Sequence, residues 1–216
     1  MIGKTMDESF IGLEGTSPFQ TLDLIHSSRF ENIVKALTGQ CEWKDVIESD
    51  DELKQRLTSQ GIENHDTRAS IPWDDATLLF ISGMKIGLEG QLDVGLSRER
   101  FGRFPYGNGS ALDYLIEWIR PPKGRDSEFD LVFQSLQHLN NRLPEHLSLG
   151  NAGLHMRGWL NVEEVKLLRR NLTGRNWTPA FDEPLDGGCR DVFKHLSAHL
   201  RSAEKRTAGL LLRSHN

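Results

Sequence analysis

Helical periodicity with a stop signal at the end is the feature that most constrains the fold of this chain. Apolar residues recur at i, i+3, i+4 and i+7 in Phe30–Leu37, and related spacings return in Leu112–Ile119, Phe129–Leu139 and Val192–Ala203. This spacing gathers apolar side chains on one side of a helix, where they can be buried. Pro121-Pro122 ends the second segment, because proline cannot continue the helical hydrogen bonds. The pattern predicts at least five amphipathic helices around a core.

Residues that start helices precede several of these segments. The capping-box spacing occurs three times, in Ser28 with Glu31, Ser49 with Glu52, and Asn161 with Glu164. In the first of these helices, Ser27 is an alternative cap residue. Ser110 stands where it can cap the helix that Pro121 ends, and Pro72 suits the first turn of another helix. These signals predict where the helices begin.

Strands are few and short in this interpretation. Residues 19–25 alternate weakly and predict a strand, Leu154–Trp159 predicts an irregular one, and Leu210–Arg213 predicts a strand that closes the chain. Glycines interrupt residues 86–109, which we expect to be irregular. We therefore expect an α+β fold: a mostly helical single domain over residues 19–216, with a small sheet that includes a C-terminal strand. Residues 1–18 are expected to be a loose N-terminal segment.

Composition narrows the class of protein. The 216 residues are 37% hydrophobic and 26% charged, which is typical of a folded globular chain. The net charge of −5 gives no general attraction to nucleic acid or to anionic lipid, so neither is expected as a partner. Cys41 and Cys189 form no CxxC pair and are expected to be reduced. No signal peptide or membrane-length apolar run is apparent, which predicts a cytoplasmic protein.

Two acidic groups are the candidate binding residues. They are Glu48, Asp50, Asp51 and Glu52 in one group, and Asp74 with Asp75 in the other. Both groups lie near expected helix starts, where carboxylates interact favourably with the helix dipole. The alternative interpretation is an acidic patch that docks a basic protein.

Two other patterns could carry chemistry. His195 and His199 are four residues apart on the last helix and could share a metal, but the HExxH motif would require Glu at position 196, which is Leu196. We expect both histidines at the edge of the buried stripe, with no bound metal and no cofactor. Gly107–Ser110 leads into a helix N-terminus that could hold an anion, although the lysine of a P-loop is missing. A tight turn with a helix cap is favoured there.

Part of the sequence resembles a group of uncharacterised bacterial proteins. The similar segments are Trp159–Val165, with its Glu-Glu-Val helix start, and Thr207–Leu212, with its Gly-Leu-Leu strand. Tyr106–Trp118 is also similar to their central helix, with Asn-Gly-Ser inserted. The resemblance implies a small bacterial α+β domain, similar in size and charge to immunity proteins that bind toxins. It transfers no catalytic residue.

Two main functional hypotheses follow from these observations, and a structural or oligomeric scaffold is a third possibility. The first is a non-catalytic protein-binding module, immunity or antitoxin-like, that uses the acidic groups to bind a protein partner of basic character. The second is a small-molecule or metal-dependent enzyme with a site near Gly107–Ser110 or at His195 and His199. The absence of a Gly-x-Ser-x-Gly nucleophile motif places the binding module first.

Overall fold

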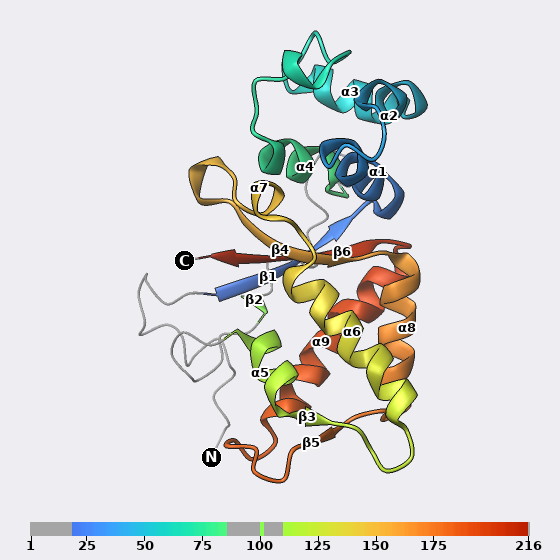
Figure 1. The fold of residues 1–216 in the computed structure, drawn as a ribbon, viewed down its shortest axis with the longest axis vertical. Coiled ribbons are helices and arrows are strands. Elements are labelled where there is room, and N and C mark those ends of the chain that lie inside the picture. Colours follow the sequence, from blue (N-terminus) through green and yellow to red (C-terminus); the bar gives the residue numbers. More distant parts are fainter. Residues whose placement is uncertain (1–18, 86–99, 102–109, 216) are drawn as a thin grey trace, which may run out of the picture.

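A four-stranded antiparallel sheet lies at the centre of the molecule (Figure 1). The computed structural model describes residues 19–85, 100–101 and 110–215. The strand order is β2-β1-β6-β4, and the strands are β1 (Phe19–Ile25), β2 (Arg100–Phe101), β4 (His155–Leu160) and β6 (Gly209–His215). The first and last strands pair along their whole length, with Phe19 opposite His215 and Ile25 opposite Gly209.

One face of the sheet is covered by the helices of the N-terminal half and by α7. These are α1 (Ser27–Leu37), α2 (Trp43–Ser49), α3 (Asp51–Ser59), α4 (Asp75–Gly83) and α7 (Glu145–Ser148), with a 3-10 turn at Arg68–Ser70. They form the upper layer in Figure 1. Their apolar side chains make one core with Ile25, Trp159 and Leu211 from the sheet.

The opposite face is covered by longer helices. These are α5 (Ala111–Trp118), α6 (Asp126–Asn141), α8 (Val162–Thr173) and α9 (Gly188–Lys205), which form the lower layer in Figure 1. A two-stranded sheet of β3 (Ile119–Arg120) and β5 (Thr178–Pro179) lies at their far end, and a second 3-10 turn spans Asn151–Gly153. Leu22, Leu24, Leu210 and Leu212 belong to this second core.

Alternation along the strands explains how one sheet serves two cores. Successive side chains of a strand point to opposite faces. Leu210 and Leu212 of β6 enter the lower core, whereas Leu211 between them enters the upper core. All three are fully buried. The run of leucines near the C-terminus is therefore typical of a strand covered on both sides.

The fold class predicted from the sequence is confirmed. The described residues form an α+β structure in which helices predominate and the C-terminal segment is a strand of the sheet. The segment 1–18 and most of residues 86–109 lie outside the described residues. Among the described helices, none has the length and apolar character that crossing a membrane requires.

The predicted helix starts are correct in some places and wrong in others. The Asn161–Glu164 capping box is present at α8, and Ser110 caps α5 by accepting a hydrogen bond from the Asp113 amide. The box at Ser28 is wrong, because α1 begins at Ser27 and its N-cap residue, His26, makes no side-chain cap. The starts predicted from Ser49 and Pro72 also need correction. Aspartates cap these helices instead, Asp50 at α3 and Asp74 at α4.

The strand predicted as irregular is β4, which pairs with β6 over its whole length apart from a register shift between Met156 and Gly158. Gly158 lies against the backbone of α6. A Cβ atom at this position would stand 2.1 Å from the His138 carbonyl oxygen and 2.8 Å from that of Leu139. The close approach of helix and strand therefore requires glycine here.

Candidate functional site

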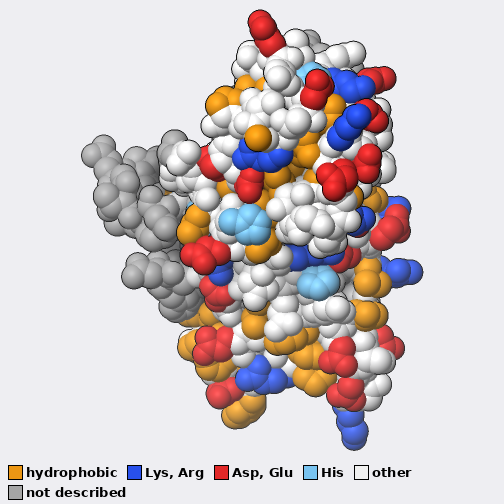
Figure 2. Space-filling view, turned by 45° about the horizontal axis from the view of Figure 1, so that its top comes forward, with side chains coloured by type: hydrophobic (Ala, Val, Ile, Leu, Met, Phe, Trp, Pro, Cys, Tyr) orange, Lys and Arg blue, Asp and Glu red, His pale blue; other side chains and the backbone are white. Residues whose placement is uncertain are grey.

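Negative charge is concentrated in the segment that carries α2 and α3. Residues 42–75 contain ten acidic and four basic side chains, a net charge of −6, whereas the whole chain has −5. Seven carboxylates between positions 42 and 66 are exposed, and we call them the acidic surface: Glu42, Asp45, Glu48, Asp51, Glu52, Glu63 and Asp66. Lys44 is the only exposed lysine or arginine in residues 42–66, all of which the structure describes. In Figure 2, red side chains gather on the upper part of the molecule among fewer blue ones.

A buried arginine fixes the start of α3 beneath this surface. Arg29 of α1 is 6% exposed. Its Nε donates to Asp50 Oδ2 at 2.7 Å and its Nη2 donates to Asp50 Oδ1 at 3.0 Å. Asp50 Oδ1 also accepts a hydrogen bond from the Leu53 amide at 2.9 Å, which caps α3. The two-point contact orients the carboxylate as well as attracting it.

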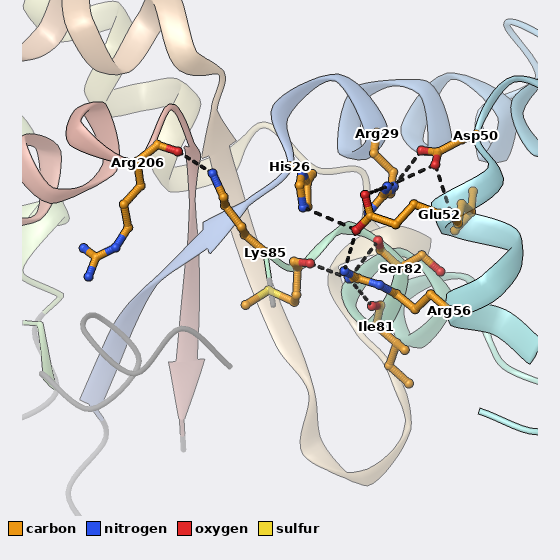
Figure 3. A network of polar contacts seen from close by, with 11 residues as sticks. His26, Arg29, Asp50, Glu52, Arg56, Ile81, Ser82, Lys85 and Arg206 are labelled. Carbon is orange, nitrogen blue, oxygen red and sulfur yellow. Dashed lines mark hydrogen bonds and ion pairs between the residues drawn. The ribbon is translucent and has the colours of Figure 1, made fainter. Parts of the chain in front are cut away.

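Glu52 brings two further groups into the same network (Figure 3). Its Oε2 lies 3.0 Å from Arg29 Nη2, and its Oε1 lies 3.6 Å from Arg56 Nη2 and 3.9 Å from His26 Nε2. The side chain is 60% exposed, so one carboxylate both faces solvent and contacts the cations below it. Glu52 is therefore the member of the acidic surface that is held in position from underneath.

Arg56 connects α3 to the end of α4. Its Nη1 donates to the carbonyl oxygens of Ile81, Ser82 and Met84, the groups that a helix leaves without partners at its C-terminus (Figure 3). A cation there also interacts favourably with the helix dipole. On the strand side, Lys85 donates to the Arg206 carbonyl after α9. The network thus ties α1, α3 and α4 together and reaches the end of the lower layer.

The environment fixes the ionisation of the acidic members. Burial would raise the pKa of Asp50, but hydrogen bonds from Arg29 and from the Leu53 amide outweigh it, so this pKa lies below its usual value. The hydrogen bond from Arg29 lowers the pKa of Glu52 in the same way. Burial, together with the nearby Arg29, lowers the pKa of His26. Near neutral pH the two carboxylates are charged and are therefore weak general bases.

The six predicted binding residues fall into two sets that no hydrogen bond or ion pair joins within the described part of the chain. Asp50 and Glu52 meet at Arg29. Glu48 and Asp51 are exposed and lie near lysines of their own helices, Lys44 at 3.5 Å and Lys54 at 2.9 Å.

The second set lies at the start of α4. Asp74 caps this helix through the Thr77 amide and also accepts from the Asn151 amide at 3.2 Å, whereas Asp75 pairs with Arg68. Both aspartates are half-buried, and their contacts are those of a helix start. They contribute less to an exposed acidic surface than Glu48, Asp51 and Glu52 do.

Of the two histidines predicted at the edge of the core, His195 is half-buried and agrees with the prediction, whereas His199 does not. His199 is fully buried among the apolar side chains of the lower layer, and its ring centroid is 5.0 Å from that of His195. Burial, with a smaller contribution from His195, lowers the pKa of His199 to about 4. Within the described residues, no three His, Cys, Asp or Glu side chains are grouped so as to hold a metal ion.

The other candidates have structural roles where they are described. Ser110 is the N-cap residue of α5, and the adjacent Gly107–Gly109 lie outside the described residues. Glu183, from the acidic turn before α9, accepts hydrogen bonds from the Tyr114 hydroxyl at 2.9 Å and from the Cys189 amide in the first turn of that helix. Cys41 and Cys189 are free thiols.

Arg29 is the functional residue that sequence reasoning missed. It lies four residues before Ile33 and next to Phe30, on the side of α1 that the apolar pattern predicts to be buried. A buried charge requires a partner, and the acidic group at 48–52 was available in the sequence. That combination is the signal from which the pair could have been found.

No protein-family model, curated protein or solved structure matches this chain.

Proposed function

We propose that this chain is a non-catalytic protein-binding module that docks a basic partner on its acidic surface, in the manner of an immunity or antitoxin protein. The observation that carries the proposal is the ratio of seven exposed carboxylates to one exposed lysine over residues 42–66. Such an imbalance steers a partner of opposite charge toward one face and excludes partners of like charge.

The network under α3 supports the proposal. Because Arg29 fixes Asp50 and Glu52, the start of α3, which carries Asp51 and Glu52 of the acidic surface, is in place before a partner arrives. A preorganised surface loses less conformational entropy on binding than a mobile one. The lowered pKa values of Asp50 and Glu52 also extend the pH range in which both carboxylates are charged toward more acidic pH.

The test is a charge reversal at two exposed positions, Glu48→Lys with Asp51→Lys. Proteins captured from a lysate of the source organism are identified by mass spectrometry, and the affinity of the retained partner is then measured by calorimetry. We expect a partner with a lysine- and arginine-rich surface, and a loss of affinity of roughly tenfold or more in the double variant, since its exposed charge over residues 42–66 falls from −6 to −2.

A matched control reverses two carboxylates on the other side of the sheet, Glu117→Lys in α5 with Asp130→Lys in α6. Both side chains are exposed, and the change in net charge is the same. The control should bind like the wild type. Equal losses in the two double variants, or no stable protein partner at all, would contradict the proposal.

A further inference from the structure

The long helix α9 carries a row of positive charge on its solvent side. We call Arg190, Lys194, Arg201 and Lys205 the basic stripe; all four are exposed. Their spacing of 4, 7 and 4 residues places them on one face of the helix, and the small, exposed Ala198 lies between them. The buried residues Val192, Leu196 and Ala203 occupy the other side. The stripe extends over about 22 Å, at 1.5 Å per residue.

An open groove lies between α8 and α9, and its lining residue from α9, Glu204, directly precedes Lys205 of the stripe. It encloses about 680 Å³ and is lined by Lys166, Arg169 and Arg170 of α8 and by Glu204 of α9, among others. Arg169 pairs with Glu204, and this ion pair joins the two helices. Lys166 is neutralised by Glu163 at 2.8 Å. The groove therefore contributes a concave shape to the surface, whereas the stripe and the exposed Arg170 contribute its positive charge.

We infer that the basic stripe and this groove form an interaction surface whose occupant is the acidic surface of a second copy of the chain. The two surfaces of one chain carry charges of opposite sign. Exposed side chains of α8 and α9 comprise five basic and two acidic groups, against the one exposed lysine and seven exposed carboxylates of residues 42–66. The inference rests on the proposed function of the acidic surface and names its partner.

The position of the two surfaces dictates the kind of assembly. The acidic surface lies on helices above the sheet, and the basic stripe lies on a helix below it (Figure 1). A contact between two different surfaces is head-to-tail. In a dimer of this kind, one molecule still has a free acidic surface and the other still has a free basic stripe. Association should therefore continue beyond a dimer as concentration rises, and it should weaken when salt screens the charges.

The first measurement is sedimentation equilibrium of the full chain at roughly 100 μM, a concentration suited to a weak complex. In about 10 mM salt, where the Debye length is about 30 Å, the average mass should exceed that of a monomer and rise with concentration. In about 1 M salt, where the Debye length is about 3 Å, the mass should return to the monomer value.

Two double variants, each removing one surface, make the test specific. Lys194→Glu with Arg201→Glu lowers the charge of the stripe from +4 to 0. Glu48→Lys with Asp51→Lys lowers the negative charge of the acidic surface, counted with Lys44, from −6 to −2. Each variant alone should remain a monomer in low salt. A mixture should form a 1:1 dimer and stop there, because each variant keeps the one surface that the other lacks. Far-UV circular dichroism and thermal unfolding of both variants establish that each is folded.

Three results would overturn the inference: a wild-type monomer at every concentration in low salt, association that neither double variant changes, or a mixture that stays monomeric. A failure of the self-association can be distinguished from a failure of the proposed function. A monomeric wild type that still captures a basic protein through Glu48 and Asp51 would retain the proposed function and lose the self-association. If a monomeric chain binds a DNA duplex through Lys194 and Arg201, the partner of the basic stripe is nucleic acid and not a second copy of the chain.

Discussion

At the scale of single residues, the described structure contains charges where the hydrophobic pattern predicts apolar contact. Arg29 is buried on the inner side of α1, and it is tolerated because Asp50 and Glu52 surround its guanidinium group. A buried ion pair contributes little compared with an apolar pair, but breaking it leaves a charge without compensation. The ion pair between Arg29 and Asp50 therefore helps to fix the position of α3.

This coupling is open to a double-mutant cycle of Arg29→Met and Asp50→Asn, measured by urea unfolding. Asparagine still caps a helix, so the second change removes charge and keeps the cap. We expect each single variant to lose about 2 kcal/mol of unfolding free energy, less than the 3–5 kcal/mol typical of fully buried pairs because Asp50 reaches solvent. The double variant should lose about 1 kcal/mol less than the sum. Strict additivity would show that the two side chains do not interact.

His199 is the second residue whose environment overrides its ordinary chemistry. Its folded pKa of about 4 lies below the value near 6.5 expected in the unfolded chain, because burial disfavours the charged ring. The unfolded state therefore binds more protons between these two values. The neutral ring contributes its full stability above about pH 6.5, and this contribution is lost as the pH falls toward 4.

His199→Leu should remove this acid sensitivity. Between pH 7 and pH 4.5 the wild type should lose roughly 2–3 kcal/mol through this group, at 1.36 kcal/mol per pH unit, and the variant should lose that much less. Urea unfolding at the two pH values measures the difference. His146→Gln is the control, because it also removes an imidazole, but one that is exposed rather than buried. Equal acid sensitivity in H199L and the wild type would refute the assignment.

At the scale of elements, the local signal is sufficient at α8, where the cap residue and its box partner are in one segment. Asn161 and Glu164 satisfy each other's backbone groups without help from elsewhere, and the predicted box is present. Ser49 and Asp50 both could cap α3, and the choice falls on Asp50, which also faces Arg29. The hydrogen bond from Arg29, which is 21 residues away in sequence, goes to Asp50, the residue that caps the helix. The local spacing alone does not distinguish Asp50 from Ser49.

The close contact of β4 with α6 gives a prediction at this scale. Gly158→Ala should lower the unfolding free energy by roughly 2–4 kcal/mol, because the added methyl group meets backbone atoms that cannot rotate away. Gly174→Ala is a matched comparison: its nearest neighbour would be 3.4 Å away and its φ is −70°, so alanine fits. That change should be neutral or stabilising by about 0.5 kcal/mol. Similar losses at both glycines would show that the β4–α6 contact is not tight.

At the scale of the whole molecule, the sheet separates both the apolar cores and the charged surfaces of opposite sign. The sheet separates two cores, while acidic side chains gather above it and the basic stripe lies below it. A small net charge of −5 therefore hides two surfaces of opposite sign. The proposed binding and self-association both depend on this segregation, which a composition cannot reveal.

The sequence by itself determined the fold class, most helices, the terminal strands and the acidic character of residues 42–75. These properties depend on spacing along the chain, and spacing is local. The tertiary structure alone decided that Arg29 joins Asp50 to Glu52, that Asp74 and Asp75 serve α4 instead, and that His199 is buried. Such pairings follow from which helix packs on which face of the sheet, because burial and ion pairing depend on distance in space rather than on separation in sequence.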